Sequence, residues 1–379
     1  MKPSGQGFEK LLGKADARRP GTGFYPTVML KPVCIASWCL VTVLSLTPNP
    51  LAAGCLVDDK APGSQRLFKK HLAEGCTLAQ REAHAVKASA LLAAVKEGQS
   101  IDLDGVVIRG DLALETLPVV ADPPALDGII GPPDKEVRVV AGALSIVNST
   151  VQGKIVHRSA DGTLVFSSPV TFTGTTFEQI IDLSRSVFVQ PVTLSGAVFL
   201  AEAYFVQGQF LGEVTGEKTA FGPHTRFHRS RFYAPVTFQQ SGFSGLAEFL
   251  EVRFDREANL SRTYFKLGTG FSGSLFAGLA DFSEALFDGD AFFTFTRFDG
   301  DAYFRRATFR ATADFDDAQF NGREDFSKAF FERGPQFARA KRSGEAQSLG
   351  IENRQIQYVI TLSLLLFSAV LIAYLVRSR

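Results

Sequence analysis

Phenylalanine recurs in the second half of the chain in alternating steps of five and six residues. Within residues 280–309 these positions are Phe282, Phe287, Phe293, Phe298, Phe304 and Phe309. On an α-helix such steps turn the side chain by about 500° and 600°, so no single apolar stripe forms. On a straight strand they alternate between the two faces. The pattern therefore predicts a chain that bends between one Phe and the next.

The same register extends from position 166 to position 337. Its 32 positions hold 28 Phe, with Leu at 183, 194 and 260 and Gly at 216. The residue two before each Phe is usually small, as Ala280 and Ala285 are. This is an internal repeat of 11 residues, roughly A-D-F-S-x-A-x-F-x-G-x, and it describes a repeat core rather than an aromatic ligand box. The clearest predicted core positions are Phe282, Phe287, Phe293, Phe298, Phe304, Phe309, Phe315 and Phe320.

This pattern resembles the pentapeptide-repeat family. The family's unit is a small residue, a polar residue, a central Leu or Phe, and two more polar or small residues. The resemblance implies a right-handed quadrilateral β-helix in which the central residue and the small residue two before it point inward. Here every second unit has one extra residue, so we expect about 22 residues per coil. The pattern does not predict the geometry of the corners that hold the extra residue. Glycines at 174, 196, 278, 289, 300 and 322 recur where turns are needed.

The region before the repeat has the features of a helical cap. Thr77 and Gln80 form a capping-box start, and an Ala-rich stretch then runs to Gly98, a helix stop. We expect this helix to cover the open end of the β-helix with Leu91, Leu92 and Val95. Leu103, Ile108 and Leu114 already keep the repeat spacing, and a segment with five prolines at 117–135 reads as a surface excursion.

Both ends of the chain carry targeting signals. Residues 33–46 are a 14-residue apolar run followed by prolines, as in a secretory signal, and Met29 is an alternative start to Met1. Residues 358–376 contain no charge and are flanked by arginines. As a helix they would span about 28 Å, enough for a membrane anchor. The repeat would then lie outside the cytoplasm.

The predicted fold class is an all-β solenoid, a right-handed quadrilateral β-helix with an N-terminal helical cap and a C-terminal transmembrane helix. The predicted boundaries are 1–54 for an N-terminal extension and signal peptide, 55–98 for the helical cap region, 99–157 for imperfect first coils with the Pro-rich excursion, 158–340 for the pentapeptide-repeat β-helix, 341–357 for a juxtamembrane linker, 358–376 for the transmembrane helix and 377–379 for a cytoplasmic tail.

Two cysteines, Cys55 and Cys76, remain after the predicted signal. An oxidising compartment would favour a disulfide between them. Residues 51–55 also resemble a bacterial lipobox, so lipidation of Cys55 is one alternative, and two free thiols are the other.

Charge gives little support to nucleic-acid binding, because the formal net charge is only +1. Between residues 281 and 325 there are eleven acidic residues and five arginines. Cytoplasmic relatives in the resembling family inhibit DNA gyrase with an acidic, DNA-like rod. In this chain a net basic stretch at 221–266 and the export signal argue against that role, and a solvated face is the plainer interpretation.

Candidate catalytic chemistry is sparse. His224 and His228 are four residues apart, which makes a metal pair only on a helix, and we expect them on a basic outer surface. No paired acid and base, nucleophile elbow, P-loop or dinucleotide fingerprint occurs, so no catalytic, cofactor-binding or metal residue is predicted.

We therefore expect a non-enzymatic, membrane-anchored scaffold or protein-interaction rod in the bacterial cell envelope. Its protein partner is not identified, no nucleic-acid partner is expected, and self-association stays open. The alternatives are an envelope sensor that signals through its transmembrane helix and a cytoplasmic nucleic-acid mimic.

Overall fold

The computed structural model describes residues 55, 57–58, 66–121, 136–157 and 162–342. The chain divides into two units, Met1–Ala52 and Ala53–Arg379, and all described residues belong to the second. The predicted signal at 33–46 and the predicted anchor at 358–376 lie outside the described residues. Within the described ranges, no helix is long and apolar enough to cross a membrane.

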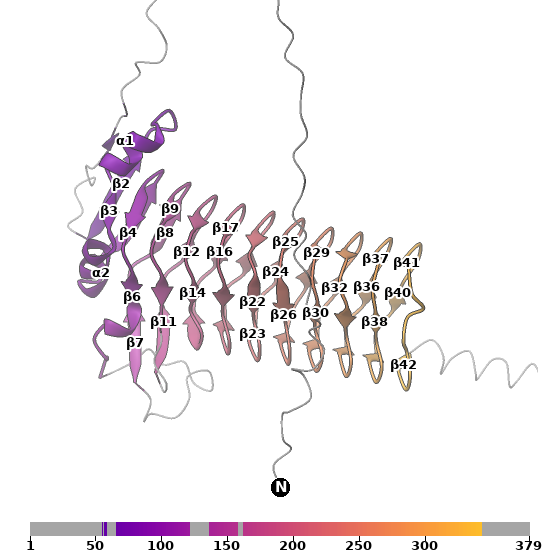
Figure 1. Ribbon diagram of the computed structural model, residues 1–379. Coiled ribbons are helices and arrows are strands. Elements are labelled where there is room, and N and C mark those ends of the chain that lie inside the picture. Colours follow the sequence, from indigo (N-terminus) through magenta and orange to yellow (C-terminus); the bar gives the residue numbers. More distant parts are fainter. Residues whose placement is uncertain (1–54, 56, 59–65, 122–135, 158–161, 343–379) are drawn as a thin grey trace, which may run out of the picture. The chain divides into compact units, whose positions relative to one another are not determined.

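The described chain is a β-solenoid built from four sheets (Figure 1). One turn contains β32 (Ala280–Asp281), β33 (Leu286–Phe287), β34 (Ala291–Phe292) and β35 (Arg297–Phe298), one strand for each sheet. The next turn begins 22 residues later, since Ala280 pairs with Ala302 in a parallel ladder. The predicted coil length is confirmed. In the first sheet eleven strands after β1 run parallel, so the described residues make about 11 turns.

Sheets 1 and 2 are joined by the five-residue corner of each turn. Sheet 1 contains β1 (Val57–Asp58), β2 (Leu67–Leu72), β4 (Ser100–Asp104), β8 (Leu144–Val147), β12 (Val170–Thr171), β16 (Val192–Thr193), β20 (Val214–Thr215), β24 (Val236–Thr237), β28 (Ala258–Asn259), β32, β36 (Ala302–Tyr303) and β40 (Glu324–Asp325). Sheet 2 contains β3 (Val86–Lys87), β5 (Val107–Arg109), β9 (Thr150–Val151), β13 (Thr176–Phe177), β17 (Val198–Phe199), β21 (Ala220–Phe221), β25 (Gly242–Phe243), β29 (Tyr264–Phe265), β33, β37 (Thr308–Phe309) and β41 (Phe330–Phe331).

Sheets 3 and 4 complete each turn in the same way. Sheet 3 contains β6 (Leu112–Ala113), β10 (Ile155–Val156), β14 (Ile181–Asp182), β18 (Ala203–Tyr204), β22 (His224–Arg226), β26 (Leu246–Glu248), β30 (Thr269–Gly270), β34 and β38 (Ala313–Asp314). Sheet 4 contains β7 (Val137–Val140), β11 (Thr163–Phe166), β15 (Ser186–Phe188), β19 (Gln209–Phe210), β23 (Arg231–Phe232), β27 (Arg253–Phe254), β31 (Leu275–Phe276), β35, β39 (Gln319–Phe320) and β42 (Lys341–Arg342).

The alternation of five and six residues produces two kinds of corner. In the five-residue unit the amide of Ala285 donates to the carbonyl of Phe282 at 3.1 Å, and Glu284 between them has φ of 58°. This is the pattern of a type II turn. Positive φ recurs every 11 residues from Gly174 to Arg339, and at most of these positions the residue is not glycine.

The six-residue corners need glycine for a different reason. Gly289 has no positive φ, but a Cβ added to it would lie 2.4 Å from the carbonyl carbon of Leu267 in the preceding turn. Close approach of backbones, not turn conformation, therefore selects glycine there. The six glycines named in the sequence divide accordingly, with 174 and 196 at the first kind of corner and 278, 289, 300 and 322 at the second.

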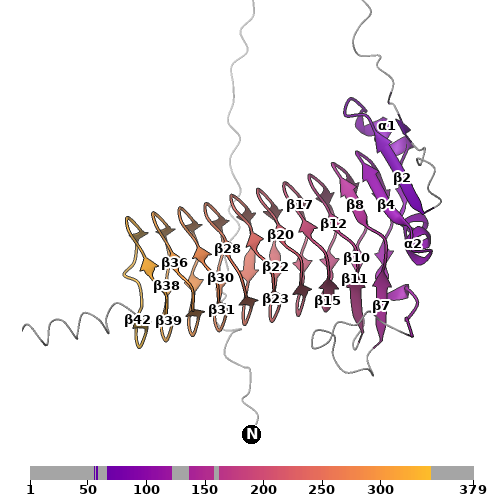
Figure 2. The ribbon, with the colours of Figure 1, turned by 180° about the vertical axis from the view of Figure 1, so that it is seen from behind.

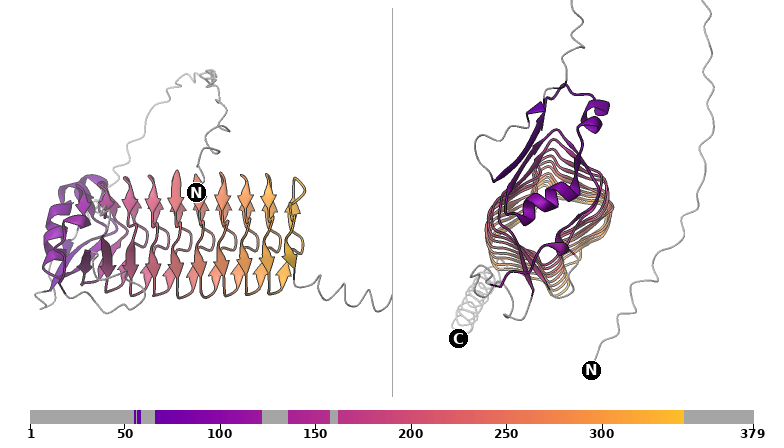
Figure 3. Two further views of the ribbon diagram at one scale, coloured as in Figure 1. Left: turned by 90° about the horizontal axis from the view of Figure 1, so that it is seen from below. Right: turned by 90° about the vertical axis from the view of Figure 1, so that its left-hand side faces the viewer.

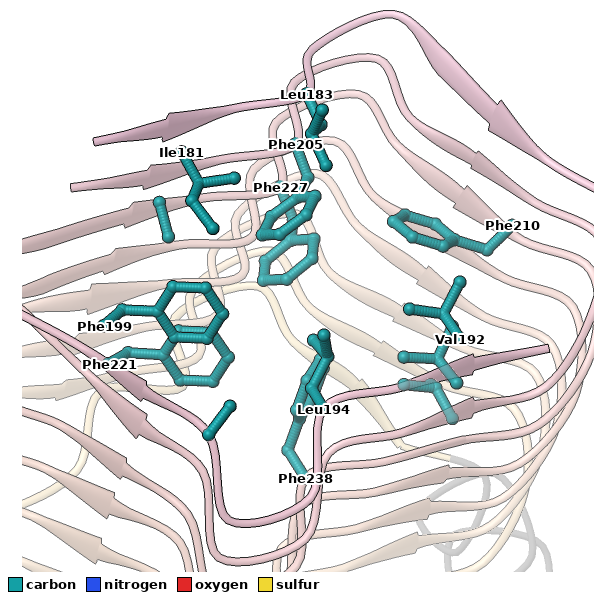
Figure 4. Packing of buried hydrophobic residues seen from close by; sticks show 14 of the residues in the cluster. Ile181, Leu183, Val192, Leu194, Phe199, Phe205, Phe210, Phe221, Phe227 and Phe238 are labelled. Atoms are coloured by element: carbon teal, nitrogen blue, oxygen red, sulfur yellow. The ribbon is translucent and has the colours of Figure 1, made fainter. Parts of the chain in front are cut away.

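The interior is a set of stacked phenylalanine columns (Figure 4). Phe199 and Phe221 lie one turn apart with ring centroids 5.1 Å apart. The eight positions from Phe282 to Phe320 singled out in the sequence are all at most 1% exposed. Gly216 interrupts its column because a Cβ there would lie 2.7 Å from Cδ1 of Phe238, whose ring occupies that space.

The small residues two before each Phe form a second inward column. Where this residue is Ser or Thr, its hydroxyl is buried, and at most of these positions it donates to a carbonyl of the preceding turn; Ser186 and Thr225 are exceptions, with no partner for the hydroxyl among the described residues. Ser274 Oγ donates to Phe249 O at 2.5 Å, and Thr296 Oγ1 donates to Phe271 O at 2.9 Å. At positions such as 274 and 296 the backbone therefore satisfies the buried hydroxyl.

The expected cap helix is two helices, and the single-helix prediction is wrong in this respect. Thr77 caps α1 (Leu78–Ala83) with the predicted capping box to Gln80. The chain then extends, because β3 joins sheet 2 and pairs Val86 with Ile108. The second helix, α2 (Ala88–Lys96), ends before Gly98 and lies across the end of the solenoid (Figure 3).

The α2 helix covers the first turn as expected, since Leu91 and Val95 are buried in the core cluster and Leu92 packs against it. Strand β2, which precedes it in the chain, pairs in parallel with β4 and already belongs to sheet 1.

The Pro-rich excursion begins after a short 3₁₀ helix, η2 (Leu114–Thr116). Leu117 is buried, Val119 bridges to Arg138 in antiparallel fashion, and residues 122–135 lie outside the described ranges. Strands β7, β11 and β15 are neighbours in sheet 4 (Figure 2). Val137, Val165 and Val187 on these strands form a small apolar cluster, with Val120 packed against it.

Candidate interaction surface

The outward positions of the sheets vary along the solenoid, whereas the inward positions repeat. In sheet 1 the second residue of each two-residue strand changes from Thr to Asn, Asp and Tyr at successive turns. The register aligns Thr193, Thr215, Thr237, Asn259, Asp281, Tyr303 and Asp325. Chemical variety is therefore concentrated on the outer surface.

Ion pairs at a spacing of one turn connect many of the outward charges. Arg229 Nε lies 2.8 Å from Glu251 Oε2, and this hydrogen bond lowers the pKa of Glu251. Glu284 bridges two turns, with Arg262 at 3.0 Å on one side and Arg306 at 2.9 Å on the other. These side chains sit at the five-residue corners, where positive φ stacks one residue above the next. They tie adjacent turns together from outside.

The two histidines singled out in the sequence do not form a metal pair. His224 Nε2 accepts a hydrogen bond from Arg226 at 3.0 Å and lies 3.4 Å from Glu248. His228 instead lies 3.7 Å from Glu251. Within the described ranges, no group of three or more His, Cys, Asp or Glu residues could hold a metal ion.

Several arginines of the basic stretch pair with carboxylates of the next turn or of their own turn. Arg226 lies 2.8 Å from Glu248, and Arg231 and Arg253 both reach Asp255, at 2.7 and 2.5 Å. Arg231 also stacks over the Tyr233 ring with its guanidinium carbon 4.2 Å from the centroid. The histidines and the arginines near them lie on the outer surface, as expected, and Arg226, Arg229 and Arg231 are paired there with carboxylates.

The carboxylates of the acidic segment at 281–325 also have partners within the solenoid wall. Each of its eleven carboxylates accepts a hydrogen bond from an Arg, a backbone amide or another polar side chain. These carboxylates are Asp281, Glu284, Asp288, Asp290, Asp299, Asp301, Asp314, Asp316, Asp317, Glu324 and Asp325. At Asp325 the hydrogen bond from Arg305 lowers the carboxyl pKa to about 2. The local acid excess thus belongs to the wall of the solenoid and gives no support to a DNA-like face.

Apolar side chains are exposed at the six-residue corner between sheets 2 and 3 and at the first residue of β26, which follows this corner. We call this set the Leu corner, and it consists of Leu200, Pro223, Leu246 and Leu267, one residue on each of four successive turns. The three leucines are 58%, 44% and 48% exposed. Sequence reasoning missed this set, although apolar residues at outward positions of the register are its signal. Exposed apolar residues that lie together commonly mark contacts between proteins.

Cys55 and Cys76 are joined by a disulfide in the structure, 21 residues apart in sequence. The bond ties the start of the described chain to the residue before the Thr77 cap. Cys76 is buried and Cys55 packs against the core.

No family model, curated protein or solved structure gives a significant match to the chain. The regular Phe spacing and the solenoid are consistent with pentapeptide repeats, and a repeat solenoid of this kind is typical of non-catalytic proteins that serve as scaffolds or interaction surfaces.

Proposed function

We propose that the protein is a membrane-anchored pentapeptide-repeat solenoid that displays protein-binding surfaces outside the cytoplasm of a bacterial-type cell. The observation that supports this proposal is the difference between the inward and the outward positions of each turn. Inward columns repeat Phe and small residues, while outward columns differ from turn to turn. A wall of this kind presents many different side chains at fixed spacing, which suits recognition of a partner and not turnover of a substrate.

The sequence and one structural feature support the proposed location. Residues 33–46 have the length and order of a secretory signal, and the uncharged run 358–376 has the length of a membrane helix. The Cys55–Cys76 disulfide is compatible with an oxidising compartment.

The Leu corner is the part of the wall best suited to a protein partner. Its leucines make no contribution to the interior, and the same columns carry polar or small residues two turns later, such as Asp290 below Leu246. We therefore assign the contact to this corner rather than to the ion-paired faces.

Topology is tested with a Ser283→Cys variant in which Cys34, Cys39, Cys55 and Cys76 are replaced by Ser. A membrane-impermeant maleimide is applied to intact spheroplasts and again after lysis. Labelling of intact spheroplasts is expected. Labelling only after lysis would overturn the proposed location and favour a cytoplasmic target.

The contact is tested by placing a photo-crosslinking amino acid at Leu246 and, as a matched exposed control, at Phe295. A discrete adduct is expected from position 246 and not from 295. Equal adducts from both positions would show that the Leu corner is not a specific contact.

A further inference from the structure

We propose that the last turn of the solenoid is a second membrane contact, which binds the interfacial region of an anionic lipid bilayer. We call residues 326–342 the terminal turn. This inference rests on the anchor at 358–376 proposed above and adds to it a surface of the folded solenoid.

Within the described residues, no further turn stacks on the aromatic rings of the terminal turn. Its three core rings stack on those of the preceding turn at centroid distances of 4.8, 4.8 and 4.9 Å. They are only partly buried, whereas the rings beneath them are 0% exposed. These rings are Phe326, Phe331 and Phe337 above Phe304, Phe309 and Phe315. In addition, Phe330 is 58% exposed at a position where the preceding turn has Thr308.

The charge of the terminal turn is opposite in sign to that of the two turns before it, residues 282–325, which contain ten carboxylates and five arginines. Residues 326–342 contain five Lys and Arg and one carboxylate, for a net charge of +4. Arg339 and Arg342 pair with Asp317 and Glu324. Lys328, Arg333 and Lys341 are exposed, and the described residues offer them no ion-pair partner.

Exposed aromatic rings beside unpaired cations fit the boundary between lipid headgroups and acyl chains. Each Lys or Arg near an anionic leaflet contributes about fivefold to binding, the equivalent of about 1 kcal/mol. A second copy of the chain is a poorer occupant, because two terminal turns of the same net charge would repel each other.

The position of the terminal turn favours the same occupant. Residues 343–357 are 15 residues that connect it to the proposed anchor. Fifteen residues reach at most about 50 Å. The anchor would therefore hold the terminal turn at a high effective concentration over the bilayer surface.

The test uses the full chain with Cys34 and Cys39 replaced by Ser and the Cys55–Cys76 disulfide intact. An environment-sensitive fluorophore is attached at Ser327→Cys in the terminal turn or at Ser195→Cys. Position 195 belongs to the same corner column six turns earlier, roughly 29 Å away. The protein is reconstituted into vesicles of phosphatidylcholine alone or with phosphatidylglycerol, each with or without quencher-labelled lipid, and vesicles are floated before measurement.

We expect floated protein whose probe at 327 is quenched in vesicles with phosphatidylglycerol, while the probe at 195 is not. Flotation with equal quenching at the two sites, or with none, would overturn the terminal-turn contact and leave the anchor standing. Energy transfer between labelled copies without lipid quenching would also overturn it and identify a second copy as the occupant. Failure to float would overturn the anchor and this inference together.

Matched variants distinguish an effect of charge on lipid contact from an effect of misfolding. Lys328→Glu should reduce the quenching at 327 at least fivefold, whereas Lys218→Glu, at the same corner five turns earlier, should not. Phe330→Thr, which introduces the residue found one turn earlier, should also reduce the quenching in vesicles with phosphatidylglycerol. Equal effects of the two Lys variants would contradict a surface confined to the terminal turn.

Discussion

The rings of Phe282 and Phe304 lie one turn apart, with centroids 4.9 Å apart and planes 2° from parallel. Phe304 continues the stack to Phe326 at 4.8 Å and meets Phe315 of its own turn edge to face at 5.4 Å. A core ring therefore contacts its own turn and both neighbouring turns, and its loss should affect all three.

Phe304→Ala should lower the free energy of unfolding by about 3–5 kcal/mol, because a buried ring is replaced by a cavity. Phe304→Leu should cost less, about 1.5 kcal/mol or below, since Leu194 and Leu260 occupy the same column naturally. Equilibrium urea unfolding followed by circular dichroism measures both. Phe295→Ala is the control, as Phe295 is 67% exposed, and should stay within about 0.5 kcal/mol. Similar costs at 304 and 295 would contradict the stacked-core account.

Ser274→Ala should destabilise the protein by about 1–3 kcal/mol, because a buried carbonyl and a buried amide each lose a partner. The hydroxyl donates to Phe249 O and accepts from the Val252 amide at 2.9 Å. Hydrogen exchange should show faster exchange of the Val252 amide. Ser195→Ala, a half-exposed serine of the same repeat, is the control and should leave that amide protected.

Asp325 should make stability depend on pH at the end of the solenoid. Its folded-state pKa of about 2 lies below the ordinary value of 3.8, so its contribution is present above pH 3.8 and is lost as the pH falls towards 2. The carboxyl is held by Arg305 at 2.6 Å. Asp325→Asn should therefore lower the melting temperature at pH 5 and have little effect at pH 2. A cost that is the same at both pH values would show that the ion pair is not its source.

Deletion of residues 258–279 should be tolerated better than deletion of residues 258–265. The longer deletion removes 22 residues, one full turn, and brings Phe282 onto Phe238 in place of Leu260. The shorter one breaks the five- and six-residue alternation, so Phe and small residues no longer alternate in register. Thermal melting and resistance to trypsin compare the two. Greater damage from the longer deletion would contradict a turn-by-turn fold.

Much of the fold follows from the spacing of a single residue type. The 22-residue turn and the Thr77 cap are confirmed, because both depend on contacts within one or two turns that the sequence pattern encodes locally. The break between α1 and α2 could not be read in the same way. Val86 leaves the helix to complete a sheet whose other strands lie far along the chain, and this tertiary pairing overrides the helical propensity of its neighbours.

The outer surface was less predictable than the core. Counting charges by segment indicated a basic face and an acidic face, but the relevant neighbours are residues i and i+22, as Arg229 and Glu251 are. Once the turn length is known, opposite charges at that spacing can be found in the sequence. The positive φ at Glu284 or Phe295 could not be predicted from the sequence. Glycine is the residue that indicates such a conformation, and it occupies only three of the corner positions with positive φ between 174 and 339.

The α2 helix has a consequence for the behaviour of many copies together. In-register parallel strands with identical side chains stacked upon one another are the arrangement by which cross-β fibrils add chains without limit. A head-to-tail filament of this protein would need the first turn of one copy to receive the last turn of another. Here α2 lies over the first turn and β1 closes sheet 1 with an antiparallel strand. The covered first turn therefore cannot receive the last turn of another copy. The stack of strands is limited to the turns of one chain.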